Sequence, residues 1–278
     1  FADKFASEGE VISTDTVYKS HDISITFETN TTQFTKGYDV VYYVFDIYIR
    51  NIENFYTSST KNTTRQYLEK VEKYALGITD ENGDPLYSTT SVLSMNGDLW
   101  RFNKAPSVVR NGVLYNYKTS IKNDIGVLYY DGSFEVISPD KYDFQKIAEK
   151  SPYQIWHFGP GLLDGNGNVR GSSSSAYKYD GASYNGIIGG RNPRAALGYF
   201  EPGHYCFVVI DGRCSFSYGA TIPNLARLMS DLGCMQAYNL DGGNTSQIKF
   251  NGSYARKSDE DQEQRKLDDI LCIGELAK

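Results

Sequence analysis

Two Asp-Gly sequences in the last third of the chain each follow a hydrophobic run. Asp211-Gly212 follows His204–Ile210, and Asp241-Gly242-Gly243 follows Met235–Leu240. A carboxylate held at the end of a strand can act as a nucleophile, a general acid or a general base. Each Asp-Gly taken singly is also ordinary turn chemistry, because Asp-Gly is a frequent hairpin turn. A shared chemical role therefore depends on whether the fold brings the two aspartates together.

The segment between these two runs has the pattern of a helix. Thr221 is a good N-cap, and Gly233 ends a stretch in which apolar residues recur at helical spacing: Leu225, Leu228, Met229 and Leu232. The order strand, helix, strand predicts a βαβ unit with two parallel strands. We therefore expect Asp211 and Asp241 at the same edge of a sheet. The N-terminus of the helix, which is a natural anion site, is expected beside them.

An arginine is expected at the same edge. Arg194–Phe200 reads as a strand joined to the next strand by the tight turn Glu201-Pro202-Gly203. This hairpin would place Arg194 opposite Ile210 and beside Asp211. A second interpretation is that Arg194 and Arg213 form surface ion pairs of little consequence. The joint placement of two carboxylates, an arginine and a helix N-terminus favours a ligand site.

The rest of the chain is mainly β in pattern. Residues 1–60 read as strands, and residues 91–136 read as a meander of short strands separated by Asn-Gly and Asp-Gly turns. Short elements complete the pattern: helices at Lys61–Leu76 and Pro139–Lys150, a turn at Asp80–Asp84, and strands at Thr245–Phe250 and Asp268–Ile273. We predict an α+β fold, a mixed β-sheet with a βαβ unit and flanking helices. Residues 1–80 are predicted to be a β-rich N-terminal extension packed on a main domain at 81–278.

Composition and charge exclude several classes of partner. The 278 residues carry a net charge of -6 and 40% hydrophobic residues, which is typical of a globular protein and argues against nucleic acid as the main partner. No apolar run is long enough for a membrane span. The 14% of aromatic residues favours a β-rich fold, and stacking on sugar rings is the alternative reading.

Other catalytic and metal motifs are absent from the sequence. It has no P-loop, no Gly-x-Ser-x-Gly elbow and no His-Glu-x-x-His motif. Four cysteines lack Cys-x-x-Cys spacing, so no structural zinc is expected, and both buried thiols and disulfides remain open: Cys206, Cys214, Cys234 and Cys272. We predict no cofactor and no metal ligands, although the sequence leaves a divalent cation open.

An ordered set of short segments resembles the phosphodiester glycosidase family. These segments are Ser94–Trp100, Phe158–Pro160, Arg191–Gly198, Val209–Arg213, Leu225–Met229 and Ala237–Gly243, with Arg265 and Asp269 near the end. Their order and spacing match over roughly residues 90–275. The resemblance implies that residues 81–278 form a catalytic domain that hydrolyses a sugar-1-phosphodiester of the GlcNAc-1-phosphate type, releasing sugar and a phosphomonoester.

The resemblance and the residue pattern together assign the site. Asp241 is expected to be the nucleophile or the base, and Arg194 is expected to hold the phosphate. The residues expected to take part in catalysis are Asp241, Asp211, Asp98 and Arg194. Those expected to bind substrate are Asn96, Arg213, Asn239, Gly242, Gly243, Asn244, Thr245, Ser246, Gly159 and Thr221.

One segment departs from the family pattern. The family usually continues Asp-Gly-Gly with Gly-Ser-Ser, whereas this chain has Asn244-Thr245-Ser246, so the identity of the substrate is least constrained there. The alternatives are a non-catalytic module that binds glycan or cell-wall polymer, and a metal-dependent phosphodiesterase. The resemblance also predicts a bacterial protein outside the cell or at its surface, exported by a signal or anchor that these residues do not contain.

Overall fold

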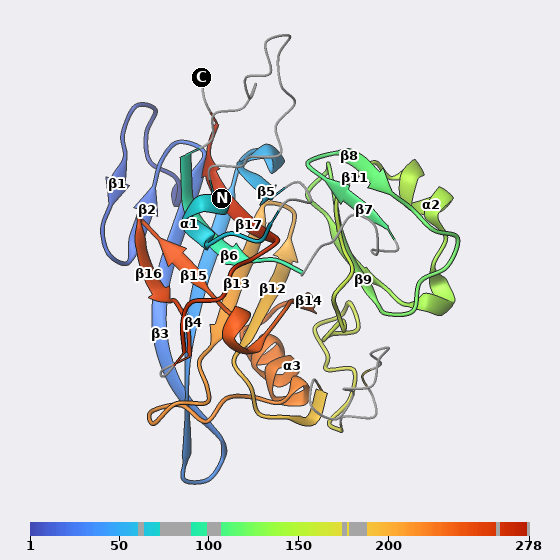
Figure 1. Cartoon of the computed structure of the whole chain (residues 1–278). Coiled ribbons are helices and arrows are strands. Elements are labelled where there is room, and N and C mark those ends of the chain that lie inside the picture. Colours follow the sequence, from blue (N-terminus) through green and yellow to red (C-terminus); the bar gives the residue numbers. More distant parts are fainter. Residues whose placement is uncertain are drawn as a thin grey trace.

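The computed structural model describes residues 1–60, 64–72, 90–98, 107–173, 177, 188–259 and 262–276. The chain is mostly β, with three antiparallel sheets and few short helices (Figure 1). The largest sheet has seven strands in the order β1 (Ile12–Ser13), β2 (Val17–Lys19), β3 (Ile23–Thr35), β4 (Tyr38–Ile49), β13 (His204–Ile210), β12 (Arg194–Glu201) and β14 (Gln236–Asn239).

Two five-stranded sheets complete the β-structure. One has the order β10 (Phe134–Ile137), β9 (Ile125–Tyr129), β11 (Pro152–Trp156), β7 (Val108–Arg110) and β8 (Val113–Asn116). The other has the order β16 (Ser253–Arg256), β15 (Ile248–Phe250), β6 (Thr90–Asn96), β17 (Asp269–Glu275) and β5 (Phe55–Ser59). The helices are α1 (Leu68–Val71), α2 (Phe144–Glu149) and α3 (Ile222–Asp231), with 3-10 turns at Ala2–Lys4, Ile52–Asn54, Pro139–Lys141 and Gly243–Thr245.

The central strand β13 is buried on both faces. Phe207 and Val209 belong to a core shared with the sheet that contains β6, β15 and β17. The alternate residues Cys206 and Val208 belong to a second core that includes the apolar face of α3. This alternation follows from the two-residue period of a strand. Burial on both faces holds β13 and its neighbours in one register, and the ends of these strands are therefore fixed platforms for the side chains that follow.

The predicted helix at the centre of the site is confirmed. α3 begins after Thr221, whose Oγ1 accepts a hydrogen bond from the backbone N–H of Asn224 at 3.2 Å. The side-chain oxygen of Asn224 in turn accepts a hydrogen bond from the backbone N–H of Thr221, so the helix begins with a reciprocal capping box. The predicted helix at 139–150 is shorter, because Pro139–Lys141 is a 3-10 turn and only Phe144–Glu149 is α-helical.

The predicted mixed sheet, βαβ unit and flanking helices are wrong, since the described chain has antiparallel sheets and few short helices. β13 and β14 are not hydrogen-bonded to each other, because β12 lies between them and pairs antiparallel with both. The β12–β13 hairpin forms within a few residues of chain, so β12 occupies the position that a βαβ crossover would give to β14. Each strand pairing in the described part of the chain is antiparallel.

The N-terminal strands are continuous with the rest of the structure. β3 and β4 form a long hairpin, and β4 pairs with β13, so residues 12–49 extend the seven-stranded sheet. β5 pairs with β17 at the edge of another sheet. A boundary at residue 80 stays a prediction, and the expected turn at Asp80–Asp84 lies outside the described residues. Within the expected helix at 61–76, residues 64–72 are described, and only Leu68–Val71 of these is α-helical.

Two further expectations concern cysteines and membrane segments. Cys206, Cys234 and Cys272 are buried free thiols, and the Sγ atoms of Cys206 and Cys234 are 3.6 Å apart. No helix in the described ranges has the length and apolar character that a membrane span requires.

Candidate active site

The start of β12 and the ends of β13 and β14 lie side by side at one edge of the seven-stranded sheet. Arg194 lies opposite Ile210, the last residue of β13, and Asn239, the last residue of β14, pairs two residues further along β12. Asp211 directly follows β13, and Asp241 follows β14 after one residue. The structure therefore brings Arg194 to the edge that holds both aspartates, although the connection through β12 differs from the predicted parallel pair.

The loop Asp241-Gly242-Gly243 packs directly against the start of β12. The Gly243 N–H donates to the Pro193 carbonyl at 2.9 Å. A Cβ on Gly242 would stand 3.0 Å from that same carbonyl, and a Cβ on Gly243 would stand 3.2 Å from Nη1 of Arg213. Gly243 also has a φ of 64°, which disfavours other residues. The two glycines thus allow the backbone that carries Asp241 to approach the arginines closely.

Asp241 is a half-buried carboxylate with an altered acidity. Loss of hydration raises its pKa to about 6, although the Thr245 hydroxyl and the Arg265 charge favour the ionised form. Its Oδ1 accepts from the Gly242 N–H at 2.9 Å, and Nδ2 of Asn96 donates to its carbonyl at 2.8 Å. The side chain is therefore fixed in place with a pKa close to neutrality, which is the range suited to proton transfer or nucleophilic attack.

A small cavity lies against this carboxylate. Its volume is about 10 Å³, and its lining includes Gly97, Asp241, Thr245, Arg265 and Asp269. This volume is close to the minimum that one water needs. The surroundings of Asp241 therefore have room for a water-sized reactant beside the carboxylate.

Arg194 is a buried cation without an acidic partner. Its side chain is 3% exposed, Nε donates to the Ala220 carbonyl at 2.8 Å and Nη2 donates to the Gly190 carbonyl at 2.7 Å. Among the described residues it forms no ion pair with a carboxylate. Burial, and to a smaller extent the nearby Arg213, lower its pKa to about 9. A buried charge with only carbonyl partners favours an incoming anion.

Asp211 is bound tightly by other protein groups. Its Oδ1 accepts from Nε of Arg256 at 2.9 Å, and its Oδ2 accepts from the Tyr43 hydroxyl at 3.1 Å. Arg256 also binds Asp259 at 2.5 Å and the Ser246 carbonyl. Asp211 therefore connects the end of β13 to the segment that follows Asp241. This geometry suits a positioning role better than direct attack on a substrate.

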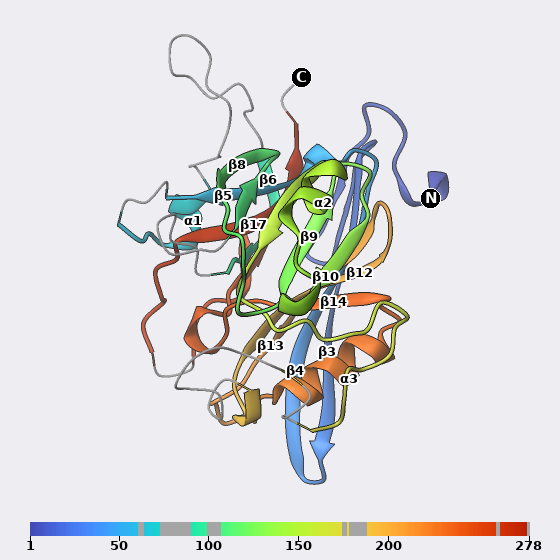
Figure 2. The ribbon, with the colours of Figure 1, turned by 90° about the vertical axis from the view of Figure 1, so that its right-hand side faces the viewer.

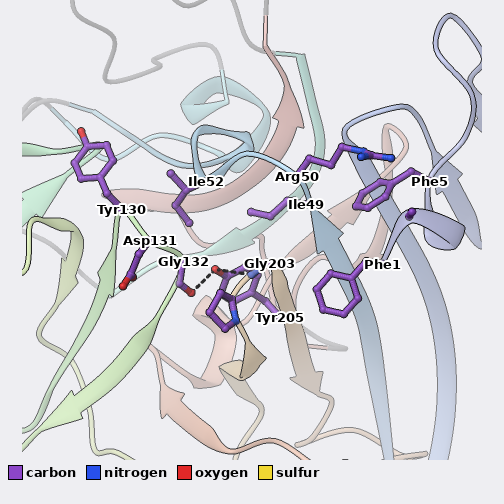
Figure 3. A pocket seen from close by; sticks show the side chains of 12 residues that line it. Phe1, Phe5, Ile49, Arg50, Ile52, Tyr130, Asp131, Gly132, Gly203 and Tyr205 are labelled. Atoms are coloured by element: carbon purple, nitrogen blue, oxygen red, sulfur yellow. Dashed lines mark hydrogen bonds between the residues drawn. The ribbon is translucent and has the colours of Figure 1, made fainter.

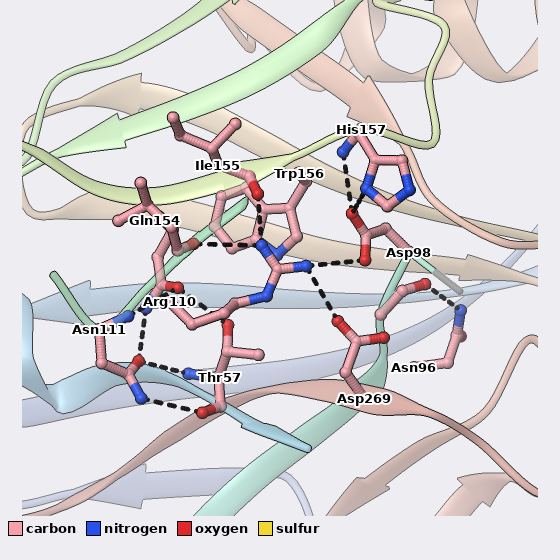
Figure 4. A network of polar contacts seen from close by, with 12 residues as sticks. Thr57, Asn96, Asp98, Arg110, Asn111, Gln154, Ile155, Trp156, His157 and Asp269 are labelled. Atoms are coloured by element: carbon pink, nitrogen blue, oxygen red, sulfur yellow. Dashed lines mark hydrogen bonds and ion pairs between the residues drawn. The ribbon is translucent and has the colours of Figure 1, made fainter. Parts of the chain in front are cut away.

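Asp98 belongs to a buried cluster beside the Asp241 loop (Figure 4). Nη2 of Arg110 lies 2.8 Å from Asp98 and 3.2 Å from Asp269, and His157 binds Asp98 through both Nδ1 and its backbone N–H. Burial opposes ionisation of Asp98, but Arg110 and His157 outweigh it and hold its pKa well below the usual range. Burial and the charge of Asp98 raise the pKa of Asp269 well above the usual range. Asp98 is thus ionised and enclosed by partners.

Residues 89–274, about two thirds of the chain, match the phosphodiester glycosidase family. The chain belongs to this family. It is also 25% identical over 244 residues to the SPbeta prophage-derived uncharacterized protein YomE of Bacillus subtilis (strain 168), a match that covers 80% of this chain but 36% of that protein. The chain therefore spans about a third of the length of this relative.

Solved structures show that the family fold extends over nearly the whole chain. The catalytic domain of zebrafish N-acetylglucosamine-1-phosphodiester alpha-N-acetylglucosaminidase, described as auto-inhibited by its pro-peptide, superposes with a TM-score of 0.67 at 18% identity, covering 91% of this chain and 83% of that chain. A hypothetical protein from Synechocystis gives a TM-score of 0.60 at 11% identity, covering 92% and 62%. A putative exported protein from Burkholderia pseudomallei K96243 gives a TM-score of 0.54 at 13% sequence identity, covering 87% of this chain and 74% of that chain.

The predicted substrate-binding residues of this family member are divided between free and occupied groups. The buried Oδ1 of Asn239 and the buried hydroxyl of Ser246 have no hydrogen-bond partner among the described residues, so both keep capacity for a ligand. The amides of Asn96 and Asn244 instead bind protein groups. Asn96 donates to the Asp241 carbonyl, whereas Asn244 donates to the Glu263 carbonyl and accepts from the Asp259 N–H. These two asparagines position the loop.

The remaining predicted residues frame the site. The Gly159 carbonyl accepts from Nδ2 of Asn239 at 2.8 Å, and Gly159 has a φ of 72°. Thr221 caps α3 and lines a larger cavity together with Arg213. Thr245 is buried next to Asp241. The catalytic and binding roles of all these residues stay predictions.

The local sequence does not predict the two buried arginines, Arg110 and Arg256. Arg110 and Arg256 are 0% and 3% exposed, and each binds two aspartates. Each also lies at the end of a short strand, where a basic residue normally faces solvent. Nothing in the local sequence distinguishes them, since their partners are distant in the chain.

Metal ligands and a further cavity are the two remaining features that could carry chemistry. No group of three or more His, Cys, Asp or Glu side chains suited to a metal ion occurs in the described ranges. A cavity of about 450 Å³ lies at the opposite end of β12 and β13, where Phe1, Arg50, Asp131 and Tyr205 contribute to its wall (Figure 3). It contains none of the predicted site residues.

Proposed function

We propose that this protein hydrolyses the glycosidic bond of a sugar-1-phosphodiester of the GlcNAc-1-phosphate type, releasing the sugar and a phosphomonoester. The observation that carries the proposal is the close approach of the Asp241 loop to Arg194, a buried cation with no acidic partner in the described structure. A carboxylate and a free buried cation are the two groups that this reaction needs.

The chemistry divides naturally between the two groups. Asp241 in its ionised form either attacks the anomeric carbon, giving a glycosyl ester that water then hydrolyses, or removes a proton from the water that attacks this carbon directly. The bond between the anomeric carbon and the phosphate oxygen breaks, and the electron pair leaves with the phosphate. Arg194, assisted by the more exposed Arg213, stabilises the negative charge that the leaving phosphate gains. A phosphate leaving group needs little protonation, so a second carboxylic acid is not required.

The pH dependence of kcat/KM tests the role of Asp241. Both proposed roles require the ionised carboxylate, and burial raises the pKa of Asp241 to about 6. We therefore expect kcat/KM to rise with pH through a limb near 6, rather than near 4 as for a solvated aspartate. A rate that falls as pH rises through 6 would make Asp241 a general acid instead.

The reaction itself is tested by the position of bond cleavage. We would incubate the protein with a GlcNAc-1-phosphate diester in ¹⁸O-labelled water, with and without EDTA, and analyse the products by mass spectrometry. Free sugar plus an unlabelled phosphomonoester supports the proposal, because water then attacks carbon. Sugar-1-phosphate, or ¹⁸O in the phosphomonoester, contradicts it and indicates attack at phosphorus, as in a phosphodiesterase; loss of that activity in EDTA would make the phosphodiesterase metal-dependent. Saturable binding of the diester with no product indicates a glycan-binding module.

A further inference from the structure

A second cavity opens beside the proposed site, on the side of Arg213. Its volume is about 860 Å³, and its lining includes Arg191, Arg213, Tyr218 and Thr221. Arg213 contributes to this cavity and to the proposed site, since its Nη1 also lies close to Gly243 of the Asp241 loop. We call this cavity the Arg191 pocket. Its size is within the ~300–1,000 Å³ of typical ligand pockets, so it holds more than a single phosphate.

The charge of the Arg191 pocket has one sign. Its two charged lining residues are Arg191 and Arg213, and no acidic side chain lines it in the described structure. Among the described carboxylates, Arg191 pairs with none and Arg213 pairs with Asp259, at 3.5 Å. Nη2 of Arg213 also donates to Oδ1 of Asn192 at 2.5 Å. The N-terminus of the ten-residue helix α3 adds a partial positive charge through the cap residue Thr221. The pocket therefore presents a net positive surface to a ligand.

The Arg191 side chain is held in position by the β3–β4 hairpin. Its guanidinium lies 4.8 Å from the centre of the Tyr218 ring, and Nη2 donates to Oγ1 of Thr35 at 2.8 Å. Tyr218 is held in turn, because its N–H donates to the Asp39 carbonyl at 2.9 Å and its ring lies 4.4 Å from that of Tyr38. A cation fixed in this way loses little side-chain entropy when it binds an anion.

The hairpin that supports Arg191 and Tyr218 lies outside the family match, although the residues that line the pocket lie within it. β3 and β4 precede residue 89, whereas the Asp241 loop lies within the matched segment. The hairpin projects beyond the ends of the neighbouring strands, and its tip reaches past α3 (Figures 1 and 2). The hairpin thus acts on the pocket through the positions of Arg191 and Tyr218 and not by lining it.

We propose that the Arg191 pocket binds the aglycone of the phosphodiester and selects an aglycone that carries a second phosphate. The substrate class is then a polymer of sugar or polyol units joined through phosphodiesters. This inference rests on the proposed function, because it takes the bond beside Asp241 as the one that breaks. The first phosphate lies at Arg194 and Arg213, and the second lies at Arg191.

Two matched substrates test the selection. One is the diester of GlcNAc-1-phosphate with glycerol, and the other carries an additional phosphate on the terminal glycerol hydroxyl. We expect a KM about 10-fold lower for the phosphorylated substrate, the worth of one charge-assisted contact. Arg191→Gln should reduce this ratio at least several-fold. Arg227→Gln, which changes an exposed arginine on α3, should keep it. Equal KM values for the two substrates in the wild type would overturn the inference.

Binding to an Asp241→Asn variant separates the two proposals. Titration calorimetry with the same two compounds measures anion selection without turnover. A preference for the phosphorylated compound that Arg191→Gln weakens supports the Arg191 pocket even if the wild type cleaves neither compound, in which case the proposed function fails alone. Equal affinities for the two compounds remove the pocket from substrate selection even if cleavage occurs.

Discussion

Asp241→Asn is expected to lower kcat by about 10²- to 10⁴-fold, the usual worth of a positioned acid or base. Asparagine keeps the shape of the side chain and an oxygen that can accept from the Gly242 N–H, which lies 2.9 Å from Oδ1 in the native loop. It removes the charge that attacks carbon or accepts a proton. Steady-state kinetics on a GlcNAc-1-phosphate diester measures the loss. A variant with close to the wild-type rate would exclude Asp241 from the mechanism.

The same substitution is expected to stabilise the fold at neutral pH. The pKa of Asp241 is raised from 3.8 to about 6, so the folded state holds a proton more tightly than the unfolded state. The resulting stability is present at low pH and is lost as pH rises between about 4 and 6. Asparagine does not titrate and avoids this loss, which is of the order of 3 kcal/mol.

Urea unfolding at pH 4 and pH 7 measures this effect. The difference in the free energy of unfolding between variant and wild type should be larger at pH 7 than at pH 4. Asp231→Asn serves as the control, because Asp231 is exposed at the end of α3 and its side chain forms a 3.7 Å pair with the exposed Arg227. A variant that gains no stability at pH 7 would show that Asp241 is hydrated in the folded protein.

Local patterns in the sequence predicted the elements that carry the site. The tight turn before His204 predicted the β12–β13 hairpin, and in the structure Arg194 pairs with Ile210 as the hairpin requires. Thr221 and the apolar spacing after it predicted α3. These features depend on residues close together in the chain, where turn geometry and capping decide the conformation.

The pairing of strands distant in the chain could not be predicted in the same way. A strand, helix and strand in succession fit a parallel βαβ unit, and they fit equally a sheet in which β12 separates β13 from β14. The ends of both strands reach the same edge in either case, so the expected proximity of Asp211 and Asp241 does not depend on the pairing. The role of Asp211 does depend on distant residues, since Arg256 and Tyr43 come from other strands.

The buried cluster around Arg110 is the clearest example of a feature that the local sequence does not reveal. Arg110 binds Asp98, 12 residues away, and Asp269, 159 residues away. The sequence analysis assigned Asp98 to catalysis on the basis of the family resemblance. In the structure Asp98 is enclosed by Arg110 and His157. The neighbouring Gly97 carbonyl accepts from the Asp241 N–H, so we expect Asp98 to act by positioning the Asp241 loop.

Arg110→Leu is expected to destabilise the protein by about 3–5 kcal/mol, the usual cost of breaking a buried ion pair from one side. Arg110 and Asp98 have fully buried side chains, and burial together with the charge of Asp98 raises the pKa of Asp269, so Asp98 is the main counter-charge of Arg110. Leucine would leave the Asp98 charge buried with only His157 to bind it. Urea unfolding at pH 7, together with the yield of folded protein, measures the loss.

Asp269→Asn is the matched comparison for this prediction. Asparagine resembles the protonated carboxyl that the raised pKa of Asp269 implies, so we expect a loss of stability below about 1 kcal/mol. Arg110→Lys should fall between the two variants, because lysine keeps the charge but cannot reach both aspartates with a planar pair of donors. A large loss in Asp269→Asn would show that Asp269 is ionised. A loss in Arg110→Leu no larger than that in Asp269→Asn would show that the charge of Arg110 is not what holds Asp98 and the neighbouring Asp241 loop in place.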